Sequence, residues 1–152
     1  HDWSKFSPTE FFESIKYYNG KQSPITQCKK ENGYSKAWIH HKGRNKHHPE
    51  YWVDDTAPMQ TPIIPYKYTA EMICDKLSAC KVYNGKNWTK SSELEYWNIE
   101  KHKTKINKQI EELLTEVFEQ VAENGIKKTL TRKNIKELRL AKTEKIADNI
   151  YI

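Results

Sequence analysis

The sequence is organised around one histidine-rich stretch, Ile39-His40-His41-Lys42-Gly43-Arg44-Asn45-Lys46-His47-His48-Pro49-Glu50. A helix from about residue 33 is expected to carry the first histidine pair and to stop at Gly43, because glycine commonly terminates helices. Residues 44–48 show no periodicity and predict a loop. Pro49 fits the first turn of a short helix that would follow. The stretch therefore predicts a helix, a loop and a second helix, with a histidine pair at each junction.

Helical signals continue on both sides of this stretch. Ser7-Pro8-Thr9-Glu10 has the form of a capping box, and Phe11, Phe12, Ile15 and Tyr18 then recur at helical spacing up to Gly20. Thr69 is expected to cap a helix over residues 70–83. Other helices are expected to start at Ser23-Pro24, at Ser92 (through Trp97) and at Thr131, the last with Ile135 and Leu138 on its apolar side. A long amphipathic helix is expected to end at Gly125 and to carry Ile106, Ile110, Leu113, Val117 and Val121.

These patterns predict an all-α chain, a single-domain helical bundle over residues 1–125 followed by a C-terminal helix and tail over residues 126–152. The 152 residues, 36% of them hydrophobic, suffice for a core. No apolar run could span a bilayer, so no membrane partner is expected. Three cysteines without a CxxC motif argue against a disulfide framework and against a zinc finger, which favours a reducing, cytoplasmic location.

Charge and aromatic content leave several kinds of ligand open. The net charge of +6 suits a phosphate-bearing ligand or weak nucleic-acid binding, although the lysines of the C-terminal half are more simply a solvated helix face. Most aromatic residues near the histidines are expected in the core, with Tyr51 or Trp52 also able to stack on a base. This core set is Trp3, Phe6, Tyr17, Tyr18, Trp38, Tyr51 and Trp52, together with Cys74 and Cys80.

The first candidate metal ligands are His1 and Asp2. Imidazoles and carboxylates together bind divalent metal ions. Adjacent residues on a helix diverge by about 100°, so one could bind an ion directly while the other reaches around to it. Lys5 follows His1 by one turn and could neutralise a phosphate oxygen. A plain surface turn is the alternative interpretation.

The two histidine pairs raise the number of candidates. Adjacent histidines on a helix cannot both face inward, so either His40 or His41 is expected to bind metal or substrate and the other to support it. His47 and His48 precede a helix N-terminus, which favours the neutral, ligating form of imidazole. Glu50 could bind a histidine or the metal. A helix C-terminus that favours charged histidine and a polar surface loop are the corresponding alternatives.

Asp75 is the last candidate ligand. It is expected beside the apolar stripe of the helix over residues 70–83, where a carboxylate needs a partner. A metal ion would serve, and so would a salt bridge. Glu71, one turn earlier, is the rival acidic residue.

The motifs together resemble known families. His1-Asp2 with Lys5 and a later Asp75 is similar to the HD-domain superfamily of metal-dependent phosphohydrolases, which is all-α and inserts extra histidines where His40, His41, His47 and His48 fall. The superfamily's first histidine precedes the His-Asp pair, so an upstream ligand or a substitute histidine is expected. Closer still, the following segments resemble a family of unknown function, DUF5662: residues 1–11, 37–41, 45–52, 58–59 and 71–75.

The leading hypothesis is a metal-dependent phosphohydrolase acting on a nucleotide or another small phosphate ester. His1, Asp2 and Asp75 would hold an ion, the histidine loop would complete the site or hold a second ion, and Lys5 and Arg44 would bind phosphate. A His/Asp ligand set favours Mn, Fe, Zn or Ni. The alternatives are an HD-type di-iron oxygenase and a non-catalytic nucleotide-binding protein. The substrate, metal and oligomeric state stay open.

Overall fold

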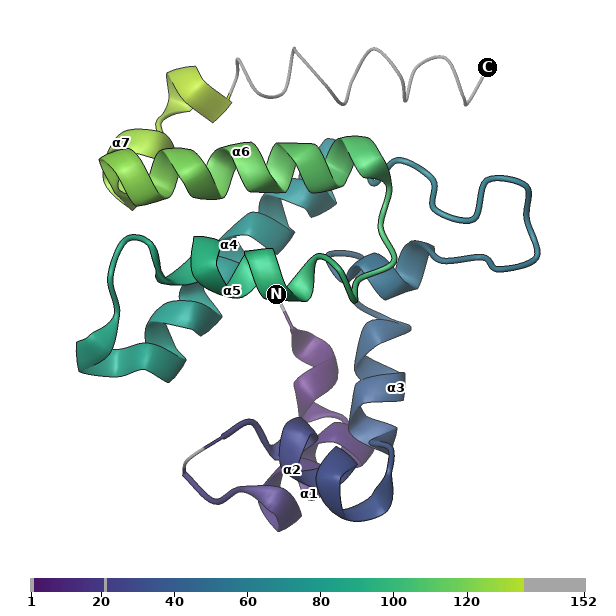
Figure 1. Ribbon diagram of the computed structural model, residues 1–152. Coiled ribbons are helices and arrows are strands. Elements are labelled where there is room, and N and C mark those ends of the chain that lie inside the picture. The colour runs from purple at the N-terminus through teal and green to yellow at the C-terminus, as the bar shows by residue number, and fades with distance from the viewer. Residues whose placement is uncertain (1, 21, 136–152) are drawn as a thin grey trace. The chain divides into compact units, whose positions relative to one another are not determined.

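The computed structural model describes residues 2–20 and 22–135, and within these ranges the secondary structure is entirely helical (Figure 1). This confirms the all-α prediction. None of the helices in the described ranges is long and apolar enough to cross a membrane. The elements are η1 (Trp3–Phe6), α1 (Pro8–Tyr17), α2 (Pro24–Asn32), α3 (Lys36–Lys42), η2 (Pro49–Trp52), α4 (Tyr66–Asn84), η3 (Gly85–Asn87), α5 (Ser92–Glu100), α6 (Lys108–Asn124) and α7 (Ile126–Thr129).

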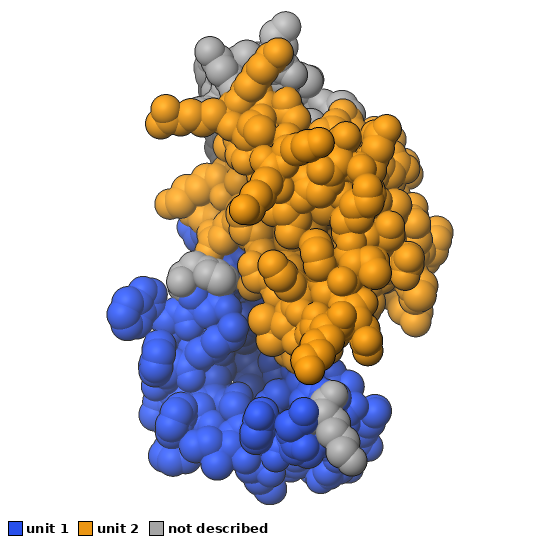
Figure 2. All heavy atoms as spheres, turned by 90° about the vertical axis from the view of Figure 1, so that its left-hand side faces the viewer, with its two compact units in different colours: residues 1–51 blue, residues 52–152 orange. Residues whose placement is uncertain are grey.

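The chain separates into two compact units, residues 1–51 (unit 1) and residues 52–152 (unit 2), coloured separately in Figure 2. In unit 1, α1 packs against η1, α2 and α3. In unit 2, α5 packs against α4 and α6, and α6 packs against α7. Nothing in the composition around residue 51 signals this division. The boundary placed after residue 125 stays a prediction.

Unit 2 has a conventional hydrophobic core. The amphipathic helix predicted over 106–125 is confirmed as α6, although Ile106 precedes it, and Gly125 caps it. Its buried side chains follow the 3–4 spacing of one helix face. Trp97 of α5 is fully buried, and its indole N–H donates to Thr115 Oγ1 at 2.9 Å. The buried core comprises Ile64, Met72, Ile73, Leu77, Trp97, Ile110, Leu113, Leu114, Val117, Phe118 and Val121.

Unit 1 buries several polar side chains and exposes an apolar helix face. Glu10, Ser35, His41 and His47 are buried there, each at most 4% exposed. The apolar face of α1 points outward instead, with Phe12 67% exposed. The expectation that the nearby aromatics lie in the core is therefore wrong for Trp3, Phe6, Tyr18 and Tyr51, which are exposed, whereas Tyr17, Trp38 and Trp52 are partly buried. The cause is that α1 turns its polar stripe, Glu10, Glu13, Ser14 and Tyr17, inward.

Several helix starts also differ from the prediction. Gly33 adopts φ +79° and ends α2, so α3 begins only at Lys36, with Ser35 as its N-cap. Thr69 lies inside α4, which begins after Pro65; its hydroxyl donates to the Ile64 carbonyl at 3.1 Å. The cap of α5 is Ser91 rather than Ser92. Cys74, expected in the core, is exposed.

The described start of the last predicted helix agrees with the sequence. The Ile135 amide donates to the Thr131 carbonyl, and Thr131 Oγ1 accepts from the Asn134 amide at 3.2 Å. Leu138 lies outside the described residues.

A buried carboxyl group stands out in unit 2. Glu93, near the start of α5, is 2% exposed, and its Oε1 has no hydrogen-bond partner among the described residues. Burial raises the pKa of Glu93 to about 7, and the Glu100 and Asp75 carboxylates add to this, while the Lys76 ammonium and the Cys80 thiol act against it. Near neutral pH this side chain is therefore poised between its acid and ionised forms.

We expect this carboxyl group to make unit 2 less stable as the pH rises. Folded Glu93 keeps a proton that the unfolded chain releases near pH 4.5, so its contribution to stability is complete below that pH and is lost as the pH rises to about 7. In that window the free energy of unfolding should fall by about 1.4 kcal/mol per pH unit from this group. Urea unfolding of wild type and Glu93→Gln at several pH values measures the difference. Glu95→Gln, an exposed neighbour on α5, serves as the control and should retain the wild-type slope.

Candidate metal centre

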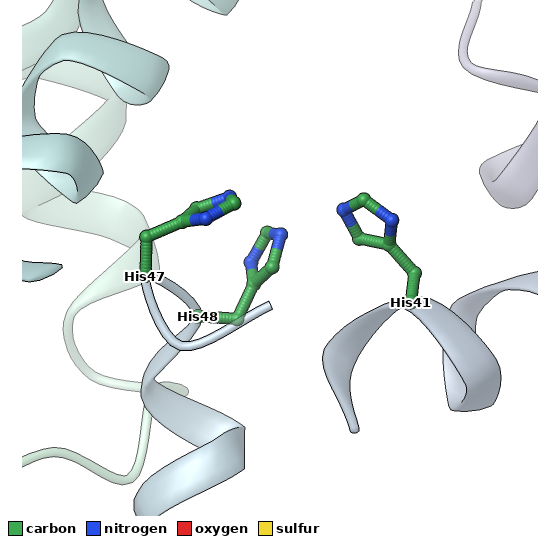
Figure 3. Close-up of side chains that lie close together, drawn as sticks. All are labelled: His41, His47 and His48. Carbon is green, nitrogen blue, oxygen red and sulfur yellow. The ribbon is translucent and has the colours of Figure 1, made fainter. Parts of the chain in front are cut away.

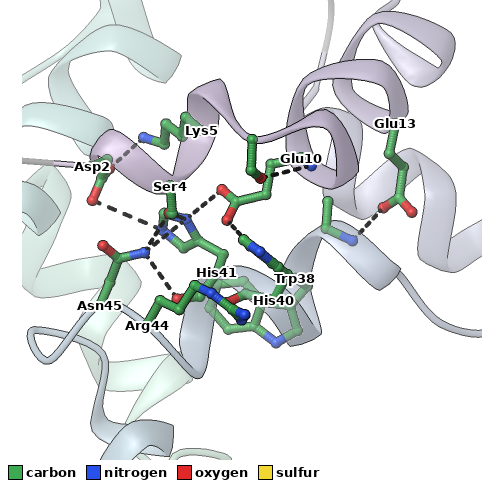
Figure 4. A network of polar contacts seen from close by, with 12 residues as sticks. Asp2, Ser4, Lys5, Glu10, Glu13, Trp38, His40, His41, Arg44 and Asn45 are labelled. Atoms are coloured by element: carbon green, nitrogen blue, oxygen red, sulfur yellow. Dashed lines mark hydrogen bonds and ion pairs between the residues drawn. The ribbon is translucent and has the colours of Figure 1, made fainter.

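Two carboxylates of α1 hold the short helix α3 at both ends (Figure 4). Glu13 Oε1 accepts from the Ala37 amide at 3.2 Å and from the Ser35 hydroxyl, and its Oε2 accepts from the Lys36 amide at 3.1 Å. These amides belong to the first turn of α3, whose N–H groups have no partners within the helix. Burial opposes ionisation of Glu13, but these hydrogen bonds outweigh it and lower its pKa.

Glu10 lies one turn earlier on α1 and reaches the other end of α3. Its Oε1 lies 2.6 Å from His40 Nδ1 and its Oε2 lies 2.8 Å from His41 Nδ1. Burial raises the pKa of Glu10, but the hydrogen bonds from His40, His41 and Ser4 dominate and lower it, so the group is an ionised acceptor. Since Glu13 binds the start of α3 and Glu10 its end, the two helices are antiparallel.

The bond to Glu10 leaves the other ring nitrogen of His41 for a second partner. His41 Nε2 lies 4.0 Å from Asp2 Oδ1, and His47 Nε2 lies 3.6 Å from the same oxygen. One ligating nitrogen from each of His41, His47 and His48 lies within 4.8 Å of the others, and Figure 3 shows the three rings together. The ring centroids of His41 and His48 are 4.8 Å apart, and those of His47 and His48 are 4.3 Å apart.

These separations suit a divalent ion. Two ligands at about 2.1 Å from a tetrahedral ion are about 3.4 Å apart. The Asp2 and His47 atoms need to move by only a few tenths of an ångström to meet that value. The His41–Asp2 separation needs a slightly larger closure. His41, His47 and His48 could thus hold one ion, and Asp2, which lies near His41 and His47, could join them. An imidazole-rich set with one carboxylate favours transition metals over Mg²⁺.

Neighbouring groups fix these donors in place. Asn45 Nδ2 donates to the His41 carbonyl at 2.9 Å and to Ser4 Oγ at 2.8 Å, which ties η1 to the end of α3. The Trp38 indole stacks on His41 with ring centroids 6.1 Å apart and meets His48 edge-on at 5.1 Å. Lys29 covers the Trp38 ring at 4.7 Å. Burial lowers the pKa of Lys29, and the Glu50 carboxylate partly offsets this.

Asp2 is paired with a cation beside the cluster. Its Oδ2 lies 2.5 Å from Lys5 Nζ, and the Lys5 side chain is 62% exposed. Burial raises the pKa of Asp2, but the hydrogen bond and charge of Lys5, with His41 and His47, outweigh it and lower the pKa. Asp2 is the N-cap of the 3₁₀ helix η1 and therefore not part of an α-helical turn.

The other candidate residues occupy different positions. His40 contacts Glu10 rather than the three clustered imidazoles, so its role as a ligand stays a prediction. Arg44 is exposed, and its guanidinium contacts the His40 carbonyl at 3.5 Å. Glu50 lies in η2, directly after the His47-His48 pair. Asp75 lies on α4 in unit 2, partly buried, and stays a predicted ligand. His1 lies outside the described residues.

Sequence reasoning missed the role of Glu10. Its position three residues after Ser7 favoured a capping box, and Ser7 Oγ does accept from the Glu10 amide at 3.4 Å. The Glu10 carboxylate turns to the histidines instead of back to the cap. The available signal was the polar stripe that Glu10 and Glu13 begin, at i, i+3 spacing on one face of α1. Asn45 and Ser4 carry no comparable signal, because polar residues in loops are common.

Comparison with protein families identifies the family of this chain. The model of the family described as "Family of unknown function (DUF5662)" matches residues 1–120. No curated protein and no solved structure matches the chain. The resemblance to DUF5662 that the sequence motifs suggested is confirmed.

The hydrogen bonds from Glu13 to the start of α3 predict a specific loss of stability when they are removed. Glu13→Ala removes the acceptor for the Lys36 and Ala37 amides and for the Ser35 hydroxyl, so we expect unit 1 to lose about 1–3 kcal/mol of stability. Hydrogen exchange of the α3 amides measures this directly. Glu31→Ala, an exposed carboxylate on α2, should change stability by less than about 0.5 kcal/mol. Equal protection of the α3 amides in wild type and Glu13→Ala would contradict the assignment.

Proposed function

The chain belongs to the DUF5662 family, and from this premise we propose that it is a metal-dependent phosphohydrolase acting on a nucleotide or another small phosphate ester. The observation that carries the proposal is the group formed by His41, His47 and His48 within unit 1, with Asp2 close to the first two of them. The HD-domain resemblance of His1-Asp2 and Lys5 points the same way. A bound Mn, Fe, Zn or Ni ion would supply Lewis acidity and a more acidic water at neutral pH.

Each residue of the proposed site has a defined task. Asp2 and the three imidazoles hold the ion, and Glu10 keeps His41 in the ligating form. Lys5, charged and largely exposed beside Asp2, binds an oxygen of the substrate phosphate. Arg44, exposed on the loop after α3, can add a second, bidentate contact.

Metal content tests the first half of the proposal. Protein purified without chelator should contain a stoichiometric transition metal by elemental analysis. His47→Ala should lose most of it, because removing one of four donors leaves an incomplete set around the ion. His102→Ala is the matched control, since His102 is exposed in unit 2 and should keep the wild-type content. A wild-type metal content in His47→Ala would refute the site.

Phosphate release tests the second half. With Mn²⁺ or Ni²⁺ added, the wild-type chain should hydrolyse some member of a panel of nucleotides and phosphate esters. Lys5→Ala should retain its metal but lose about 10–100-fold in kcat/KM, the value of one charge-assisted hydrogen bond. Lys16→Ala, an exposed lysine on α1, should be unaffected. A ligand that binds and stays intact with every metal would favour a non-catalytic binding protein, and O₂ consumption by iron-loaded protein would favour an oxygenase.

A further inference from the structure

We propose that Glu10 is a positioning residue whose single carboxylate sets the tautomers of His40 and His41 and directs the Nε2 lone pair of His41 toward the ion. The proposal rests on the metal-dependent function above, although its first test needs no metal. Under this proposal His41 is a metal ligand, whereas the adjacent His40 serves only as a partner of Glu10.

The contacts with Glu10 assign the proton positions, because its carboxylate is nearer to His41 Nδ1, at 2.8 Å, than Asn45 Nδ2 at 3.1 Å or Ser4 Oγ at 3.2 Å. Ionised Glu10 can only accept, so the Nδ1 atoms of His40 and His41, at 2.6 and 2.8 Å, must each donate. A neutral imidazole that carries its proton on Nδ1 has its lone pair on Nε2. Glu10 is 3% exposed, so water does not compete for these bonds. His41 is therefore held with the nitrogen that metals prefer turned away from Glu10.

Helix geometry then separates the two rings. Adjacent side chains on α3 diverge by about 100°. His41 directs its Nε2 toward Asp2, 4.0 Å away, and lies against His48. His40 is the more exposed of the two, with 20% of its side chain accessible, and is not part of the three-imidazole cluster. His40 thus binds the second oxygen of Glu10, and this contact keeps the carboxylate oriented toward His41.

In a purely structural role, Glu10 would only link α1 to α3 through its hydrogen bonds. The chain contains the comparison needed to separate the two roles. Glu13 lies on the same helix, one turn along, and binds the same partner helix, but it contacts backbone amides and Ser35 and no imidazole. Loss of either carboxylate removes a tie, whereas only loss of Glu10 removes an imidazole acceptor.

The first experiment reads the tautomers in the metal-free full chain. Long-range ¹H–¹⁵N spectra near pH 8 should show His41 as the Nδ1–H form in wild type. Glu10→Met has a similar length without an acceptor and should convert His41 to the Nε2–H form that free histidine prefers. Glu13→Met should leave His41 unchanged. Retention of the Nδ1–H form in Glu10→Met, or the same conversion in Glu13→Met, would overturn the proposal.

Glu10→Gln provides a second, milder variant should Glu10→Met not fold. Its amide oxygen can accept from only one imidazole, and its NH₂ group faces the other. Exactly one of His40 and His41 should then change tautomer. Both histidines keeping the wild-type form would count against the proposal.

The second experiment measures affinity for Co²⁺ by its absorption spectrum. Loss of a carboxylate that orients a histidine ligand typically weakens metal binding by about 10–100-fold, so Glu10→Met should show that loss and Glu13→Met should not. Wild-type affinity in Glu10→Met would overturn the positioning role. If wild type itself binds no Co²⁺, the metal site fails, while the tautomer result still decides whether Glu10 controls His41.

Discussion

Unit 1 depends on two carboxylates that one helix presents to another. Glu10 and Glu13 lie one turn apart on α1 and bind opposite ends of α3, so α3 cannot slide or rotate without losing hydrogen bonds at one end. A helix of seven residues has little stability of its own, because nucleation is costly and few internal bonds form. The direction of His41 follows from this attachment.

The two units obtain their stability from different sources. Unit 2 buries leucine, isoleucine, valine and aromatic side chains from α4, α5 and α6. Unit 1 buries Glu10, Ser35, His41 and His47 and exposes Trp3, Phe6, Phe11 and Phe12 of η1 and α1. Buried polar groups stabilise a fold only when their hydrogen bonds are complete. A metal ion bound by the four donors would cross-link η1, α3 and the loop before η2, so its binding energy would also be folding energy for this unit.

The sequence predicted the helices well and the burial in unit 1 poorly. Proline located the start of α1, and glycine located the ends of α3, α4 and α6, since these residues restrict or free the backbone locally. Gly20 did not end α1, which stops at Tyr17. The apolar spacing of Phe11, Phe12 and Ile15 indicated a helix correctly but the wrong buried face. Periodicity shows that two faces differ; it does not show which face a neighbouring helix covers. Here Glu10 and Glu13 decided the matter, because their partners lie more than twenty residues away in α3.

The candidate site was likewise predicted only in part. Composition alone indicated that Asp2 and the histidines could converge, and for His41, His47 and His48 they do. The difference between His40 and His41 could be anticipated only as an alternative, because the choice depends on the carboxylate of α1. A metal site of this kind uses its supporting residues twice. Glu10 orients a ligand and also joins two helices, so the groups that prepare unit 1 for chemistry are the same groups that hold it together, and selection on one property constrains the other.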